Sequence, residues 1–257
     1  MDWIPLATRL GLHIALGYLL SLLFLGPAPV GKFFYQMTGW TAAIAAGLAG
    51  LLALSQGWPE QTMEQWRVAA TLGTVVPAYW YISNKPKVRR RALIVACLSG
   101  IGALAAQAFG PHGLGSLQLA GDLAGSAVAG GVCFAMVFGH GYLTVPNLPF
   151  SHLVRINTFT AVVLALRLLL SATALALAWS RLTGGYRPEL TTFDWLDLMV
   201  RFGVGLFLPL LFAWMVHSSL RYRNNQSATG ILYASTVLVW IGEAVALHLG
   251  GRWEVAL

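Results

Sequence analysis

The sequence predicts an all-α, polytopic integral membrane protein, a single transmembrane helical domain over residues 1–257 with short loops. Hydrophobic residues make up 57% of the chain and charged residues only 10%, against about 25% in an ordinary soluble domain. Such a chain cannot cover itself with a polar surface, so a lipid bilayer is its expected surroundings. Its apolar residues also fall into runs of about 18 or more, which predicts about eight membrane-crossing helices.

The expected spans follow these runs in chain order. Pro27 and Pro29 close the first span, and Pro77 makes the short third span a kinked one. Asp194 or Asp197 is expected to begin the seventh helix, because acidic side chains suit the N-terminal end of the helix dipole. The predicted ranges are 7–26, 34–54, 68–83, 92–109, 117–139, 153–179, 194–220 and 228–249.

The loop charges predict the orientation. If the basic segment 84–91 is cytoplasmic, eight spans place both termini on the non-cytoplasmic side, and every loop on the inner side lacks acidic residues. Basic residues confined to short loops follow the positive-inside pattern, so nucleic acid is not an expected partner. Compact, alanine-rich spans with minimal loops indicate a bacterial inner membrane. The inner basic residues are Lys32, Lys85, Lys87, Arg89, Arg90, Arg91, Arg155, Arg221 and Arg223.

Ionisable residues within the spans are candidate functional groups, because each costs about 2.5–3.5 kcal/mol to insert. His13, Asp122, Arg201 and Glu243 lie toward the outer side. Arg201 and Glu243 are each about 10 Å deep, on consecutive antiparallel helices, so they can pair. With Asp122 they form either a structural ion pair or a quinone or proton site. Arg167 lies near mid-membrane without an acid at its depth and is expected to snorkel, meet a cofactor carboxylate or contact another subunit.

Three histidines gather toward the inner side, two of them in the turn 139–155 between the fifth and sixth spans. Neutral imidazole is a good axial ligand of haem iron, so His140 and His217 are candidate metal ligands of a haem b. Arginines surround this level and can hold the propionates of a haem. The remaining candidates at this level are His152, Arg155 and Arg221.

An outer pair of histidines, His13 and His248, is a candidate site for a second haem. The alternative for any of these histidines is a structural role, because histidines at span ends commonly cap helices or meet lipid headgroups. No CxxCH sequence is present, which excludes covalent c-type haem attachment to this chain. Cys97 and Cys133 fall within spans and lack the spacing of a zinc site.

These features favour a membrane subunit of a respiratory or photosynthetic electron-transfer complex that binds haem b, quinone or both. The short loops leave no soluble catalytic domain, so other membrane or redox subunits are expected partners. One alternative is a non-catalytic anchor or scaffold of a larger complex. Another is a transporter or channel subunit, with Pro77 and Pro209 as the candidate helix breaks. A membrane enzyme of another kind is the last alternative.

Overall fold

The computed structural model describes residues 3–25, 31–82, 86–111, 113–144, 148–183 and 190–257, which form a helical bundle without a strand. Seven stretches of these residues are long and apolar enough to cross a membrane. The chain is therefore a polytopic membrane helical bundle. Its elements are α1 (Trp3–Leu25), α2 (Lys32–Leu54), α3 (Thr62–Trp80), α4 (Pro86–Ala108), α5 (Ser116–Thr144), α6 (Phe150–Thr183), α7 (Thr192–Met199), the π-helix η1 (Val200–Phe207), α8 (Leu208–Arg221) and α9 (Asn225–Trp253).

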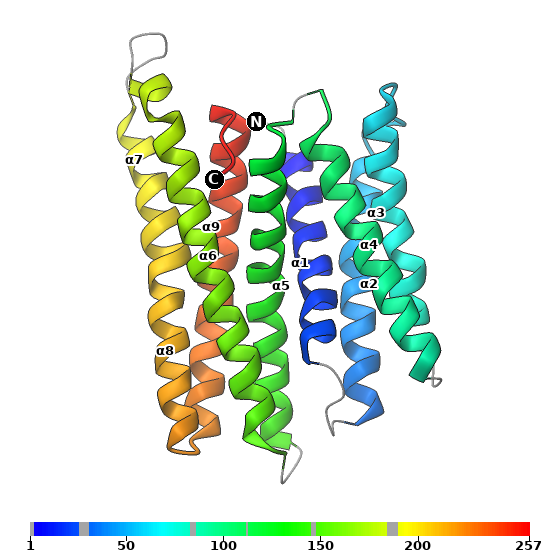
Figure 1. Cartoon of the computed structure of the whole chain (residues 1–257), viewed down its shortest axis with the longest axis vertical. Helices are drawn as coiled ribbons and strands as arrows, with labels where there is room; N and C mark the ends of the chain where they lie inside the picture. The colour runs from blue at the N-terminus through cyan, green and yellow to red at the C-terminus, as the bar shows by residue number, and fades with distance from the viewer. Residues whose placement is uncertain (1–2, 26–30, 83–85, 112, 145–147, 184–189) are drawn as a thin grey trace.

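The expected number of eight apolar spans is corrected to seven, because α3 is not among them. The predicted third span, 68–83, lies within and just beyond α3, whose first turns carry Glu64, Gln65 and Arg67. These polar residues lower the hydropathy of the helix. Even so, α3 packs lengthwise against α2 and α4 (Figure 1).

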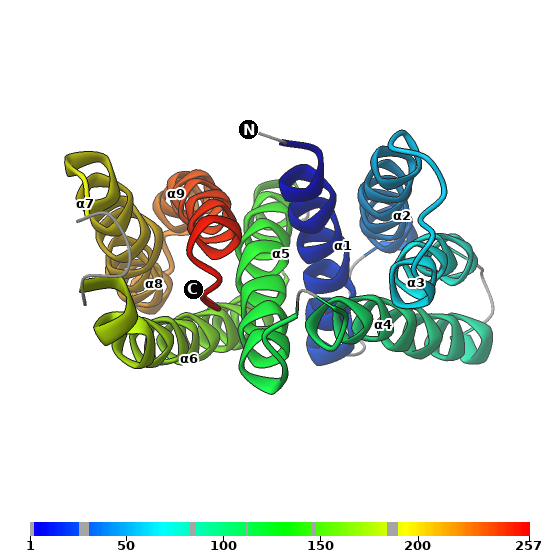
Figure 2. The ribbon, with the colours of Figure 1, turned by 90° about the horizontal axis from the view of Figure 1, so that it is seen from above.

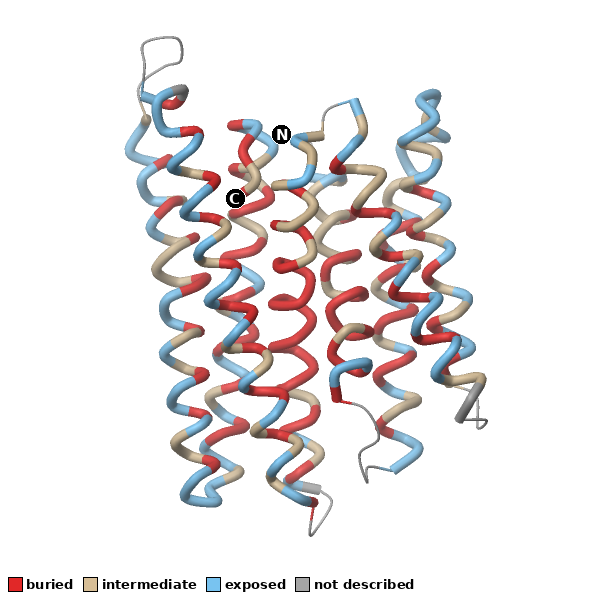
Figure 3. Tube along the Cα trace, in the orientation of Figure 1, coloured by how far each residue is buried: buried red, intermediate tan, exposed pale blue. Residues whose placement is uncertain are grey.

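Two helices, α1 and α5, form the centre of an elongated bundle (Figure 2). On one side of this pair lie α2, α3 and α4, and on the other side lie α6, α8 and α9. In its most apolar window α5 is 78% buried inside the protein, whereas α6 is only 33% buried. Figure 3 shows the same contrast as buried positions along α5 and alternating exposed positions on α6. Side chains on α5 therefore face protein rather than lipid.

Glycines bring the central helices into backbone contact. A Cβ atom on Gly17 of α1 would overlap the backbone of α5 at Ser126 and Gly130, and one on Gly205 would overlap Gly242 of α9. Close approach at small residues is the usual way in which membrane helices gain van der Waals contact. The first crossing fixes α1 against α5, and the second fixes η1 against α9.

The seventh span is one continuous helix in which α7 passes into the π-helix η1 and then into α8. It begins after Thr191, whose side chain forms a capping box with Asp194, and it winds as a π-helix from Val200 to Phe207. Pro209 follows and has no N–H to donate to the carbonyl of Gly205, four residues earlier. The Leu208 N–H reaches Gly203, five residues back, which is the π-helical pattern.

Both termini lie at the same end of the bundle (Figure 1). The opposite end carries basic residues where helices begin or end, including Lys32, Arg155 and Arg221. The acidic residues Glu64 and Asp194 begin helices at the terminal end. Among the described residues the acidic side chains are thus confined to the terminal half of the bundle, where basic residues such as Arg9, Arg67 and Arg252 accompany them.

Candidate functional site

Glu243 of α9 is the centre of a buried ion cluster. Its Oε1 atom accepts a hydrogen bond from Arg201 Nη1 of η1 at 2.7 Å, and its Oε2 atom accepts one from Arg167 Nη2 of α6 at 3.1 Å. Arg201 also donates to the Ser171 hydroxyl at 2.9 Å. The side chains of Glu243 and Arg201 are fully buried. Two guanidinium groups therefore compensate one carboxylate inside the bundle, as burial of such charges requires.

Two glycines of α5 make room for this cluster. A Cβ atom on Gly125 would lie 2.6 Å from Glu243 Oε2 and 3.3 Å from Arg167 Nε, and one on Gly121 would lie 3.0 Å from Arg167 Nη1. The spacing of these glycines alone indicates only close helix packing. In the structure a guanidinium and a carboxylate fill the space that the missing side chains leave.

A second ion cluster lies between α1 and α5. Asp122 Oδ1 accepts a hydrogen bond from Arg9 Nη2 at 2.6 Å, and His13 Nε2 lies 3.4 Å from the same oxygen. Arg9 and His13 are four residues apart and so share one face of α1. Asp122 and His13 are buried, while the Arg9 side chain retains 17% exposure. Arg9 therefore lies at the boundary between the buried acid and the solvent.

A small void of about 10 Å³ joins the two clusters. It is lined by Arg9 and Asp122 of one cluster and by Arg167 of the other. Three atoms at these residues lack a hydrogen-bond partner among the described residues: Arg9 Nε, Asp122 Oδ2 and Arg167 Nη1. The void has about the volume that one water molecule needs, and its walls offer both donors and an acceptor.

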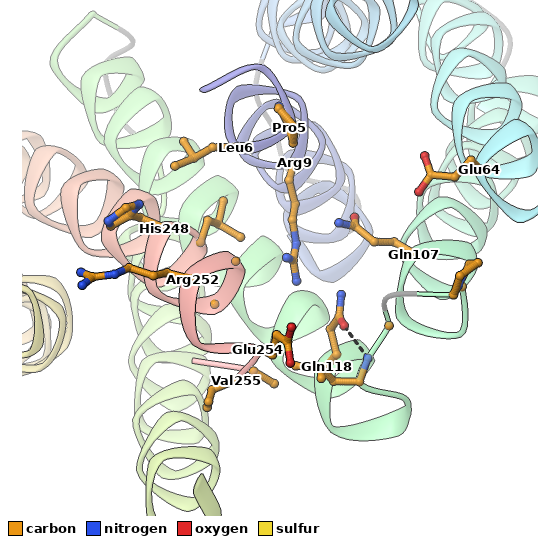
Figure 4. Close-up of a pocket in the computed structure, with 18 of the residues that line it drawn as sticks. Pro5, Leu6, Arg9, Glu64, Gln107, Gln118, His248, Arg252, Glu254 and Val255 are labelled. Carbon is orange, nitrogen blue, oxygen red and sulfur yellow. Dashed lines mark hydrogen bonds between the residues drawn. The ribbon is translucent and has the colours of Figure 1, made fainter. Parts of the chain in front are cut away.

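Above this void a cavity of about 860 Å³ lies at the terminal end of the bundle, formed by α1, α3, α4, α5 and α9. We call it the vestibule. Arg9 extends into it from α1, and the amide side chains of Gln107 and Gln118 face the Arg9 guanidinium (Figure 4). Leu6, Leu114 and Leu247 add apolar walls, and Trp3, Glu64, His248, Arg252 and Glu254 also line the vestibule. The floor is therefore rich in hydrogen-bond donors.

The segment 254–257 folds back from α9 along one wall of the vestibule (Figure 4). Glu254 adopts a left-handed backbone conformation with φ 53°, which reverses the chain, and Val255 and Leu257 are buried. The main-chain oxygen of Leu257 accepts a hydrogen bond from Arg167 Nη2 at 2.7 Å. Arg167 thus contacts both Glu243 and the segment 254–257, and this segment lies between Arg167 and the vestibule.

The structure brings together more of the membrane-depth charges than the sequence indicated. Arg201 and Glu243, which were expected to be able to pair, form an ion pair. Arg167, for which no acid was assigned, pairs with the same Glu243. Arg9 was not a candidate, although its four-residue spacing from His13 was a signal that could have identified it.

The inner histidines lie apart from these clusters. His140 belongs to α5, which continues to Thr144 instead of ending near residue 139; residues 145–147 of the expected turn are outside the described residues. His140 is exposed, and its Nδ1 atom lies 3.5 Å from the Tyr233 hydroxyl. A Cβ atom on Gly139 would meet Leu232 and Thr229 of α9 at 3.2 Å. The absence of a side chain at Gly139 therefore leaves room for the side chains of α9.

The remaining candidates are placed separately. His217 is exposed on α8, which packs against α6 and α9, and His152 is half-buried in the first turn of α6. Arg155 lies over the Phe24 ring at 4.9 Å, and Arg221 is exposed. In the described part of the chain, no group of three or more His, Cys, Asp or Glu side chains is arranged to hold a metal ion. The haem sites thus stay predictions.

Comparisons with protein-family models, with curated proteins and with solved structures found no match for this chain. Its function is therefore inferred from the geometry of the vestibule and the two ion clusters.

Proposed function

We propose that the protein is a membrane subunit of an electron-transfer complex that binds the headgroup of a quinone in the vestibule. The observation that carries this proposal is the position of the vestibule directly above a buried group of ionisable side chains. Arg9 belongs to both, because it lines the vestibule and pairs with Asp122. Intramembrane ionisable residues of this kind commonly mark ligand and proton sites.

The chemistry of a quinone fits the residues present. Its two carbonyl oxygens accept hydrogen bonds, and Arg9, Gln107 and Gln118 supply donors at the floor. Its ring and isoprenoid tail are apolar, as are the leucine walls. Reduction of a quinone to a hydroquinone takes up two electrons and two protons, so a redox partner subunit must supply the electrons. Protons reach the headgroup through the groups below the floor.

Labelling with an azidoquinone, on protein in lipid nanodiscs, tests this proposal. We expect the probe to label peptides that line the vestibule, and excess short-chain quinone to compete with it. Gln107→Leu removes a donor that faces Arg9 and is expected to weaken binding about tenfold, equivalent to about 1.4 kcal/mol. Gln226→Leu, on an exposed residue at the other end of α9, is the matched control. Labelling spread evenly over lipid-facing helices would contradict the proposal.

Haem b is the second redox group of the sequence-based prediction. We expect its α-band in reduced-minus-oxidised spectra of protein purified with native lipids and partners. His140→Ala and His217→Ala test the ligands, and an unchanged band in both variants would rule out that pairing. A colourless preparation would remove haem b from the proposal while leaving the vestibule as a quinone site.

A proton-coupled transporter subunit is a second candidate function, and the π-helix is the observation that favours it. π-helical turns interrupt α-helices frequently at functional sites, and transporters use interrupted helices at their binding sites. Here the interruption carries Arg201 and precedes Pro209. Proton movement across sealed proteoliposomes, dependent on an added solute and lost in Glu243→Gln, would favour this candidate over electron transfer.

The same proposal includes a bacterial inner membrane, with the basic end of the bundle in the cytoplasm. The positive-inside rule supports this orientation, since Lys32, Arg155 and Arg221 all lie at that end. The vestibule then opens on the non-cytoplasmic side, where a partner redox subunit would dock.

A further inference from the structure

Gln118 of α5 is a buried residue at the floor of the vestibule, and both ends of its side-chain amide can be assigned. The backbone N–H of Leu114 donates a hydrogen bond to the Gln118 Oε1 atom at 2.8 Å. A main-chain N–H can only donate, so the atom that it meets must be the carbonyl oxygen and not the amide nitrogen. The Nε2 atom, which carries two N–H donors, therefore points away from Leu114. Gln118 is only 5% exposed, so the protein around it holds this orientation.

The turn before α5 holds Leu114 in place for this bond. Gly115 has a left-handed backbone conformation with φ 73°, and its N–H donates to the Ala108 carbonyl at the end of α4 at 2.8 Å. A side chain on Gly113 would overlap the same carbonyl. The turn is thus packed against the end of α4, and Gln118 is bonded to a fixed donor.

Capping of α5 explains one half of the Gln118 side chain. Gln118 is the third residue of α5, where glutamine or glutamate commonly accepts a hydrogen bond from an N–H that precedes the helix. This structural role uses the Oε1 atom alone. The nitrogen of the amide lies toward the guanidinium of Arg9 (Figure 4). Capping therefore does not account for the donor end of Gln118.

Two donor groups thus face one another at the floor of the vestibule. Arg9 donates only, and one of its Nη atoms is used by Asp122 at 2.6 Å. The Arg9 Nε atom is buried and has no hydrogen-bond partner among the described residues. Neither the guanidinium nor the amide nitrogen can accept from the other, so both are suited to an oxygen atom placed between them. A ligand can supply that oxygen, because both side chains line the vestibule.

The charges at the floor favour an uncharged oxygen atom. Asp122 compensates the charge of Arg9, so the floor carries little net positive charge to attract an anion. Glu254 on the wall adds a negative charge. A carbonyl oxygen can accept a hydrogen bond from each donor without bringing a charge. A phenolic hydroxyl in the same place must turn its own hydrogen away from donors on both sides.

We propose that Gln118 determines which ligand the vestibule accepts: its Nε2 atom and the Arg9 guanidinium bind one carbonyl oxygen of an uncharged ligand. In the proposed function, on which this choice of ligand rests, the oxygen belongs to the oxidised quinone, and the hydroquinone binds less tightly. Leu114 acts on the ligand only through the orientation that its N–H gives to Gln118.

Gln118→Glu tests this inference, because glutamate keeps an oxygen for the Leu114 N–H and replaces the donor at Nε2 with an acceptor. Glutamate is also favourable in the first turn of a helix, so the variant is expected to unfold at the wild-type temperature or above it. A short-chain quinone and its hydroquinone are compared, under anaerobic conditions, as competitors of azidoquinone labelling in lipid nanodiscs. We expect the wild-type protein to prefer the quinone about tenfold or more, and Gln118→Glu to lose or reverse this preference.

Gln226→Glu makes the same chemical change at an exposed residue in the first turn of α9 and is the matched control. It is expected to keep the wild-type preference. Equal competition by the two redox forms in the wild-type protein would overturn the inference while leaving quinone binding intact. An unchanged preference in a folded Gln118→Glu variant would overturn it as well.

Modification of Arg9 by phenylglyoxal needs no quinone and separates this inference from the proposed function. The Arg9 side chain is 17% exposed, and peptide mass spectrometry reports its modification. In Gln118→Glu the new carboxylate faces Arg9 and is expected to slow the reaction several-fold, whereas Gln226→Glu is expected to leave the rate unchanged.

An unchanged rate in Gln118→Glu, or no modification of Arg9 in the wild-type protein, would overturn the arrangement of donors whatever the ligand. Slower modification in Gln118→Glu, together with a wild-type protein that azidoquinone does not label, would end the quinone function alone.

Discussion

Arg201 donates to Glu243 across the contact between η1 and α9, and neither side chain is accessible to solvent. The pair lies beside Gly205 and Gly242, where the two backbones touch. A buried charge left without its partner is costly, and the close crossing leaves no room for water to replace that partner. Loss of any one charged residue of this cluster is therefore expected to weaken the packing of η1, α6 and α9 against one another.

Glu243→Gln is expected to lower the free energy of unfolding by about 3–5 kcal/mol, because it leaves Arg167 and Arg201 without a compensating charge. The measurement is denaturant titration in mixed micelles, with Glu60→Gln as the control. Replacing the whole cluster with apolar residues, in the triple variant Arg167→Met, Arg201→Met and Glu243→Leu, is expected to recover at least half of the loss. A triple variant no more stable than Glu243→Gln would contradict this explanation.

Gly125→Ala is expected to destabilise the protein by about 1–3 kcal/mol, because its methyl group needs space that the Glu243 carboxylate occupies. The carboxylate is fixed by two arginines and cannot move aside without breaking a hydrogen bond. Gly102→Ala on α4 is the matched control, since no atom lies within 4 Å of its added Cβ. That change is expected to be neutral or to stabilise by about 0.5–1 kcal/mol. Equal effects at the two positions would argue against the steric account.

Leu114→Cys, on the wall of the vestibule, is expected to react with a membrane-impermeant thiol reagent only from the side that holds the termini. Ser151→Cys, at the exposed start of α6, is expected to react only from the other side. The native Cys97 and Cys133 are buried and are replaced by serine in the background used. Sealed vesicles of the two orientations provide the measurement. Reaction of both cysteines from one side would contradict the arrangement of the helices.

Trp240→Phe is expected to cost about 0.5–1.5 kcal/mol, because the indole Nε1–H of Trp240 donates to the Ala129 carbonyl of α5 at 3.1 Å. Trp214→Phe makes the same chemical change on the exposed face of α8, at a side chain that is 67% exposed, and it is the control. Thermal unfolding followed by circular dichroism compares the two. A larger loss of stability in Trp214→Phe than in Trp240→Phe would contradict the role given to the hydrogen bond from Trp240 to Ala129.

The fold follows from the sequence because long apolar runs leave the chain few alternatives. The seven apolar spans are where such runs occur. The helix expected to begin at Asp194 or Asp197 begins earlier, at Thr192, because Thr191 caps it and Asp194 completes the capping box three residues later. α3 shows the limit of this reasoning, because its polar first turns still pack along α2 and α4. A helix beside other helices can enter the bundle with less hydropathy than a helix surrounded by lipid.

The site was less predictable than the fold, because depth along a helix does not give its rotation. Depth alone suggested the pairing of Arg201 with Glu243. It did not suggest Arg167, whose guanidinium reaches Glu243 over Gly121 and Gly125. Arg9 resembles an ordinary charge at the membrane surface until α5 places Asp122 against it.

The π-helix makes the ion cluster dependent on the length of the seventh span as well as on its residues. A π turn holds one residue more than an α turn, so the segment before it is rotated by about 100° relative to a continuous α-helix. Removing one residue between Arg201 and Pro209 would let the span wind as a plain α-helix while turning Arg201 away from Glu243. Such a deletion would point the Arg201 guanidinium in another direction without changing any side chain of the cluster. Related chains that keep the cluster must therefore keep the number of residues between Arg201 and Pro209.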